Sequence, residues 1–154
     1  MYTNEKFSKP SFYPSPTGAI LAYSIVYTSD PARAIAFYQA LFGFEVKVKH
    51  GLWWTELACG TTSLALHWTG PPKEGAATTA PVKSSAEHGP GSSAPSFFVP
   101  ELAAWHEKIK DTPHLTVIQP PKQQQWGGCQ AVYADPDGLA FSVVEAPKAS
   151  DFKH

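Results

Sequence analysis

The side chains best suited to chemistry in this chain lie in two neighbouring apolar segments, Glu56 in LWWTELAC and His67 in TSLALHW. If both segments are strands, alternation places each polar side chain opposite the apolar face of its strand. A carboxylate near an imidazole can exchange protons at neutral pH or supply part of a metal site. Glu56 and His67 are therefore candidate catalytic residues. The plainer interpretation is a half-exposed histidine at a strand end and a solvated charge near a sheet edge.

Aromatic side chains provide a second kind of candidate, because they make up 13% of the chain and include 5 tryptophans. Tyr23, Trp54 and Tyr133 lie in β-prone segments, where they can wall a pocket that stacks a flat or apolar ligand. Tyr23 is also a candidate for proton transfer. The alternative is that these rings fill the core, and composition does not decide between the two.

Charge and cysteine content exclude several functions. Charged residues are only 16% of the chain, and 12 basic against 13 acidic residues give a net charge of −1. We therefore expect neither a nucleic-acid nor a membrane partner, and no run reaches the roughly 20 apolar residues of a spanning helix. The N-terminal residues lack a signal-peptide pattern, and the 2 cysteines form no CxxC motif. These features predict a cytoplasmic protein.

The elements that must position these side chains occur twice in the same order. Residues 31–42 predict a helix, with Asp30 as N-cap, Pro31 in the first turn and Gly43 as the stop. One β-prone run precedes this helix and three follow it. The second half repeats the order around a helix at 101–110, and DPDG at 135–138 predicts a tight turn. The β-prone runs of the first half are 20–28, 44–50, 52–59 and 62–68. Those of the second half are 95–99, 115–119, 128–134 and 139–145.

This repeat predicts the domain organisation. We expect an N-terminal arm at 1–18, a first βαβββ module at 19–68, a second at 95–146 and a tail at 147–154. The segment between the modules, 69–94, is rich in Gly, Pro and Ser. Its length and composition are typical of a linker or lid.

Two stretches resemble a known superfamily, namely SDPARAIAFYQALFGFEV at 29–46 and QWGGCQAVYADPDGLAFSVVE at 125–145. They are similar to the vicinal oxygen chelate superfamily, which includes glyoxalases, extradiol dioxygenases and bleomycin resistance proteins. The resemblance implies an α+β fold in which two βαβββ modules form curved half-barrel sheets around a cavity. It also implies a homodimer, with each half-barrel sheet completed by the other module or by a second subunit.

Metal-dependent members of that superfamily place His, Gln or Glu at four positions on the concave sheet faces. By resemblance, these positions fall here on Tyr23, on Ala65 or near it at His67, near Ala94 with Ser96 and Phe97 as alternatives, and on Ser142. Most of these side chains are poor metal ligands. We therefore predict no metal site and no cofactor, while a divalent metal stays open as an alternative.

Alternation gives the expected pocket. In TSLALHW, Leu64, Leu66 and Trp68 should lie under the helix, while Ser63, Ala65 and His67 face inward. The same rule in LAFSVVE turns Ser142 inward. We expect a metal-independent pocket for a small apolar or aromatic molecule, as in sequestration or resistance proteins. The alternatives are a lyase, isomerase or cyclase acting on a small metabolite, and a packed-shut partner-binding module. The predicted ligand-binding residues are Tyr23, Trp54, Ala65, His67, Tyr133 and Ser142.

Overall fold

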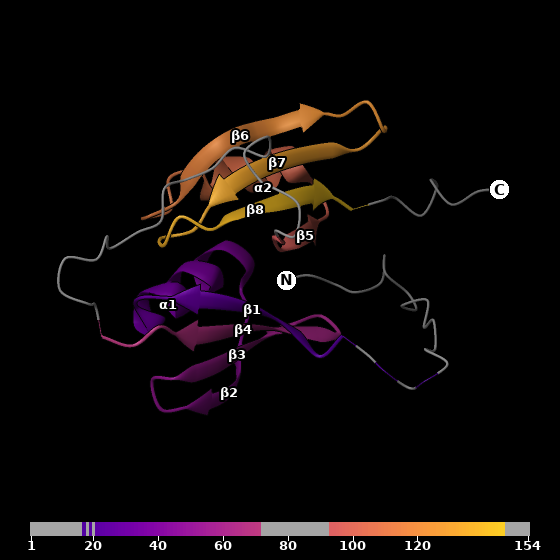
Figure 1. Ribbon diagram of the computed structural model, residues 1–154. Helices are drawn as coiled ribbons and strands as arrows, with labels where there is room; N and C mark the ends of the chain where they lie inside the picture. Colours follow the sequence, from indigo (N-terminus) through magenta and orange to yellow (C-terminus); the bar gives the residue numbers. More distant parts are fainter. Residues whose placement is uncertain (1–16, 18, 20, 72–92, 147–154) are drawn as a thin grey trace.

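The computed structural model describes residues 17, 19, 21–71 and 93–146 (Figure 1). They form two βαβββ modules, which confirms the predicted α+β fold. The predicted tail at 147–154, and most of the predicted arm at 1–18 and of the predicted linker at 69–94, lie outside the described residues. The first module comprises β1 (Tyr23–Thr28), α1 (Pro31–Phe42), β2 (Val46–His50), β3 (Trp54–Cys59) and β4 (Thr62–Trp68); the second comprises β5 (Ser96–Val99), α2 (Leu102–Ile109), β6 (Thr116–Gln123), β7 (Cys129–Ala134) and β8 (Ala140–Glu145).

Each module builds one four-stranded sheet with the same strand order. The first sheet runs β1-β4-β3-β2 and the second runs β5-β8-β7-β6. In both, the first strand pairs in parallel with the last, and the other pairs are antiparallel. The helix supplies the crossover that the parallel pair requires. The last strand of each module therefore lies inside its sheet, next to the first.

Helix α1 begins and ends as the sequence predicts. The Asp30 side chain accepts a hydrogen bond from the Arg33 amide at 3.0 Å, and Pro31 occupies the first turn. Gly43 ends the helix in the left-handed region with φ of 68°, where glycine carries little strain. Helix α2 is capped differently, because Glu101 makes no side-chain cap bond. The Glu145 carboxylate at the end of β8 instead accepts from the Leu102 amide at 3.0 Å.

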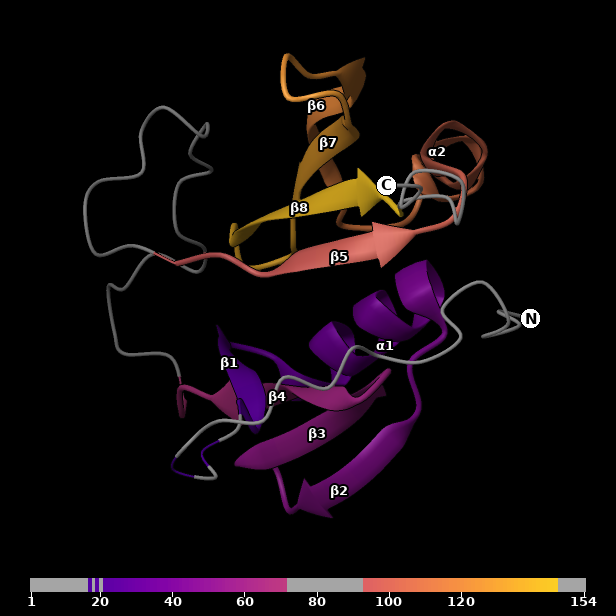
Figure 2. The same ribbon diagram turned by 90° about the vertical axis from the view of Figure 1, so that its right-hand side faces the viewer.

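The two modules share one core on the helix side of both sheets. Alternation holds in β4, where Leu64 and Leu66 are buried in this core together with Leu57 of β3. In the second sheet, Phe141 and Val143 of β8 are buried in the same core. Figure 2 shows α1 between the first sheet and strands β5 and β8. The opposite faces of the two sheets therefore point away from each other, and we call them the first and second open faces.

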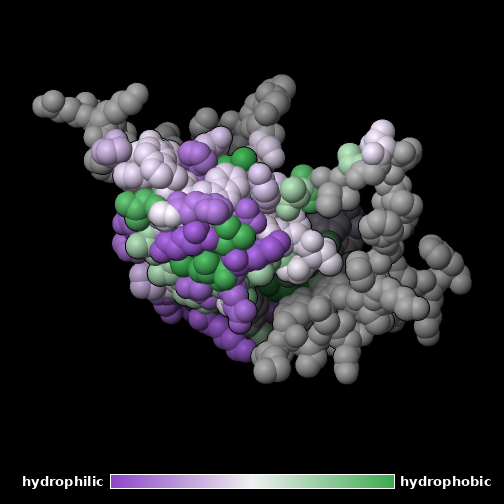
Figure 3. Space-filling view, turned by 90° about the horizontal axis from the view of Figure 1, so that it is seen from below, coloured by the Kyte–Doolittle hydropathy of each residue, from purple (hydrophilic) through white to green (hydrophobic). Residues whose placement is uncertain are grey.

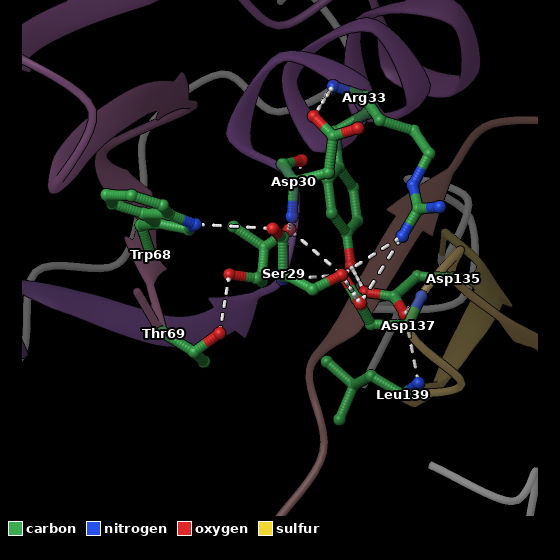
Figure 4. Close-up of polar contacts among 10 residues, drawn as sticks. Ser29, Asp30, Arg33, Trp68, Thr69, Asp135, Asp137 and Leu139 are labelled. Carbon is green, nitrogen blue, oxygen red and sulfur yellow. Dashed lines mark hydrogen bonds and ion pairs between the residues drawn. The ribbon is translucent and has the colours of Figure 1, made fainter. Parts of the chain in front are cut away.

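A polar clasp joins the second module to the start of α1 (Figure 4). Asp137, in the turn before β8, accepts from the Thr28 hydroxyl at 2.9 Å and the Ser29 amide at 3.2 Å. It also accepts from the Ser29 hydroxyl and pairs with Arg33 at 3.4 Å. Buried Asp135 accepts from the Tyr38 hydroxyl at 2.8 Å and from the amides of 137 and 139 at 2.9 Å. The DPDG motif thus fixes how the modules sit together.

Asp135 should make the stability of the protein depend on pH. Burial raises the pKa of this carboxyl above its ordinary 3.8, against the lowering effect of its hydrogen bonds. A raised folded-state pKa means that its contribution is complete below the unfolded pKa and is lost as the pH rises through the folded pKa. We expect Asp135→Asn to remove this loss, because an amide in place of the carboxyl does not titrate.

The measurement is urea unfolding of both proteins at a series of pH values from 3 upward. The curve of unfolding free energy against pH should be flatter in Asp135→Asn than in the unsubstituted chain. Asp111→Asn, at an exposed aspartate after α2, provides the matched control. Identical slopes for all three proteins would contradict the assignment to Asp135.

Candidate functional site

The candidate site lies on the first open face, where strand register brings polar and aromatic side chains together. Tyr27 of β1 and Trp54 of β3 both pair with His67 of β4, and Glu56 of β3 pairs with Ala65 of β4. Seen from the side of β2 and β3, the molecule presents apolar residues bordered by hydrophilic ones (Figure 3). The side chains that form the site are Tyr23, Ile25, Tyr27, Trp54, Glu56, Ser63, Ala65 and His67.

A pair of aromatic rings crosses the middle of this face. The Tyr23 and Trp54 ring centroids are 5.1 Å apart, with the ring planes at 73°. Tyr23 pairs with Ser63 and Trp54 with His67, so the two rings approach each other from either side of Ala65. Ala65 is fully buried beneath them. Its single methyl group leaves room for the rings to meet, and a larger residue would separate them.

Glu56 is held by its aromatic neighbour. The Trp54 indole Nε1 donates a hydrogen bond to Glu56 Oε1 at 2.9 Å. The two residues are two positions apart on β3, so their side chains share the open face. This bond orients the carboxylate and leaves its second oxygen available. Glu56 is therefore an oriented hydrogen-bond acceptor at the edge of an aromatic pair.

The tautomer of His67 follows from its own hydrogen bond. Its Nδ1 lies 3.0 Å from the Trp68 carbonyl oxygen. A carbonyl only accepts, which assigns the proton to Nδ1 and leaves a lone pair on Nε2 in the neutral ring. The ring lies among Tyr27, at a centroid distance of 5.4 Å, and Trp54, at 5.8 Å. His67 thus offers Nε2 as a base or hydrogen-bond acceptor.

The structure brings four of the predicted ligand-binding residues onto one face, namely Tyr23, Trp54, Ala65 and His67. It places Glu56 with them, but each of the two candidate acid–base groups is held by another partner. In the described part of the chain, no hydrogen bond or ion pair joins Glu56 to His67. The expected acid–base pair is therefore two separately oriented groups on a shared surface.

Ser142 lies on the second open face, remote from this set in the same chain. It pairs with Val132 of β7, and its hydroxyl donates to the Ser96 hydroxyl of β5 at 2.6 Å. Phe98, two residues further along β5, is 59% exposed on the same face. Because the two open faces point away from each other, Ser142 cannot complete the first face within one chain.

The prediction that Tyr133 lines the pocket is wrong. Tyr133 pairs with Phe141 and is fully buried in the shared core, where its ring contacts Trp105 at 5.6 Å. Its hydroxyl lies 2.8 Å from the Nδ1 atom of His106 on α2. Burial raises the pKa of Tyr133 well above its usual range. The strand register across the DPDG turn determines on which face of the second sheet the Tyr133 side chain lies.

The donor set does not fit a divalent cation. The positions that the resemblance implies hold Tyr23, Ala65 or the neighbouring His67, Ala94 with Ser96 and Phe97 as alternatives, and Ser142. Neutral hydroxyls are weak ligands beside imidazole and carboxylate groups. The described residues contain no group of three or more His, Cys, Asp and Glu side chains arranged to hold a metal.

None of the helices in the described ranges has the length and apolar character needed to cross a membrane.

Comparison with known families agrees with this architecture. The model of the glyoxalase/bleomycin resistance protein/dioxygenase superfamily matches residues 20–143, which span both βαβββ modules. The chain belongs to this superfamily. A search of curated proteins finds no match to the chain.

Solved structures share the fold of this superfamily member at low sequence identity. A glyoxalase/bleomycin resistance protein/dioxygenase family enzyme from Burkholderia phytofirmans PsJN is 18% identical with a TM-score of 0.63, over 84% of this chain and 100% of that one. TioX from Micromonospora sp. ML1 is 17% identical with a TM-score of 0.60, over 82% and 98%. Lactoylglutathione lyase from Agrobacterium tumefaciens is 22% identical with a TM-score of 0.58, over 86% and 96%.

Proposed function

We propose that this protein binds a small planar aromatic molecule on the first open face without using a metal, in the manner of a sequestration or resistance protein. The observation that supports this function is the Tyr23–Trp54 ring pair beside the oriented Glu56 carboxylate. Rings supply stacking area at small entropic cost, and a fixed polar group orients the ligand. Ala65, beneath the rings, contributes only a methyl group to the floor of the proposed pocket.

The proposed pocket is completed by a second copy of the chain. Both open faces expose large apolar side chains, with Tyr27 63% exposed on the first and Phe98 59% on the second. The helix sides of both sheets are already used in the shared core, so the other module cannot cover either face. A twofold homodimer that opposes the first face to the partner's second face buries both. It also brings Ser142 of the partner subunit toward the Tyr23–Trp54 pair.

Metal independence is supported by residue chemistry. Tyr23, Ala65, Ala94 and Ser142 offer no imidazole or carboxylate. The His67 imidazole, which is the alternative to Ala65, and the nearby Glu56 carboxylate are each held by another partner. The polar groups that remain suit hydrogen bonding to an organic ligand.

A binding assay under chelation tests this function. We expect purified protein, with less than one metal ion per chain by elemental analysis, to bind 2-naphthamide with quenching of tryptophan fluorescence. Adding EDTA should leave the affinity unchanged, since Trp54 stacks on the ligand directly. Loss of binding in EDTA, restored by a divalent ion, would replace the proposal with a metal-dependent one.

A second candidate function is an acid–base lyase, isomerase or cyclase, and the fixed tautomer of His67 favours it. An Nδ1 proton held by a carbonyl leaves Nε2 to accept a proton from a substrate. Glu56 and Tyr23 are the other candidate proton-transfer groups. His67→Gln keeps a polar side chain on the face while removing the base. For a binding protein this substitution changes affinity only, whereas for an enzyme it abolishes turnover of any substrate found by screening.

A further inference from the structure

We infer that the first open face selects aromatic molecules carrying a positively charged or N–H-donating edge, and that Glu56 makes this selection. The inference rests on the proposed function and adds the chemical class of the ligand. It follows from which hydrogen-bonding groups on this face are already used, which remain free, and what charge they carry.

The two ring N–H donors of the face are occupied. The Trp54 indole N–H is used by Glu56 Oε1 at 2.9 Å, and the His67 Nδ1–H is used by the Trp68 carbonyl at 3.0 Å. Lys47, on the neighbouring β2, donates to the Ser63 hydroxyl at 3.3 Å. Ser63 lies two residues from Ala65, the residue that pairs with Glu56, so this ammonium lies to one side of the ring pair.

The acceptors are free. Glu56 makes one hydrogen bond through one oxygen, although a carboxylate accepts several. The ion pairs among the described residues, Arg33–Asp137 and Lys110–Glu107, do not involve it. His67 Nε2 carries a lone pair in the neutral ring. A ligand lying against the rings therefore meets an unpaired negative charge and a second acceptor.

The rings add to the same preference. The faces of Trp and Tyr rings carry negative potential and attract cations, most strongly where water is excluded. A carboxylate beside two such rings favours a planar group such as an amidinium, a guanidinium or a protonated arylamine. A ligand carboxylate in the same place would face the Glu56 carboxylate at close range, with both ring N–H donors already in use. Selection is thus by attraction of one charge and repulsion of the other.

Three probes of nearly equal shape test the inference: 2-naphthamidine, the neutral 2-naphthamide and 2-naphthoate. Affinities are measured by tryptophan quenching on the full chain. We expect 2-naphthamidine to bind about 10- to 100-fold more tightly than 2-naphthamide, the range for a hydrogen bond to a charged group, and 2-naphthoate to bind most weakly. Glu56→Gln keeps an acceptor for the Trp54 indole, so it should abolish the preference for the amidine while leaving 2-naphthamide binding in place.

Glu107→Gln is the matched control, because it removes the same charge from an exposed position on α2. Its preference for the amidine should equal that of the unsubstituted protein. Equal binding of all three probes, or a preference for 2-naphthoate, would overturn the inference and leave the proposed function standing. A preference for the amidine that survives Glu56→Gln, or is lost equally in Glu107→Gln, would overturn the role of Glu56. Binding of none of the probes would overturn both the proposed function and the inference.

Discussion

Truncating Phe141 to alanine should lower the free energy of unfolding by about 3–5 kcal/mol, the range for emptying a large buried aromatic site. Phe141 is 1% exposed and lies where the two modules meet. The loss should appear as a lower midpoint in urea unfolding. The rings that would lose this partner come from both modules, and they are Phe37, Tyr38, Phe42, Phe97 and Tyr133.

Phe98→Ala is the control, since Phe98 lies on the adjacent strand β5 but on the open face. Measured at a concentration where the chain is monomeric, it should cost less than about 1 kcal/mol. Its effect should be on assembly instead. Sedimentation at micromolar concentration should give twice the 16.7 kDa chain mass for the unsubstituted protein and less for Phe98→Ala. A monomer mass for the unsubstituted protein would contradict the proposed homodimer.

Ser142→Phe should weaken binding of an aromatic probe more than 100-fold, with only a modest cost in stability. The Ser142 side chain lies on the second open face and bonds to the Ser96 hydroxyl. In the proposed homodimer, a phenyl ring at this position fills the space opposite the Tyr23–Trp54 pair of the other subunit. Because position 142 faces away from the shared core, the helix-side packing stays intact.

Tryptophan quenching with 2-naphthamide measures this effect in a variant shown to be folded by circular dichroism. Ser142→Ala serves as the matched control, because it removes the hydroxyl but keeps the space, and it should bind within a few fold of the unsubstituted protein. Full affinity in folded Ser142→Phe would place the ligand away from the second open face, and the pocket between subunits would have to be abandoned.

Period-two alternation predicted the faces of Leu64 and Leu66 in β4 correctly, whereas Trp68, expected with them, lies outside the core and contacts Trp53. The burial of Leu64 and Leu66 against the helix, opposite the face that carries Ala65 and His67, confirms the prediction. The two ends of α1 were also predictable from the sequence, because Asp30, Pro31 and Gly43 each favour the backbone conformation found at their position. Local rules therefore gave the elements and most of the first open face.

Tyr133 shows where such rules fail. Its segment, GCQAVYA, carries a single polar side chain, Gln130, so the pattern chooses a face only weakly. The pairing of Ala134 with Ala140 across the turn sets the register and turns Tyr133 toward the core. The sequence also could not predict the hydrogen bonds of Trp54 to Glu56 and of His67 to the Trp68 carbonyl, because these bonds depend on side-chain rotamers rather than on residue spacing.

The clasp between the DPDG turn and α1 has a consequence for the order in which the chain is made and folds. Tyr38 and Arg33 are synthesised about a hundred residues before their partners, which lie 97 and 104 positions later. While the ribosome is still making the second module, the Tyr38 hydroxyl and the apolar side of α1 that later meets Phe141 lack their final contacts. Synthesis at about 5–20 residues per second separates these partners by several seconds, whereas a helix forms in about a microsecond. A chaperone would therefore bind most usefully to the nascent first module, whose apolar α1 surface is still exposed. This exposure ends when β8 leaves the ribosome and packs against α1.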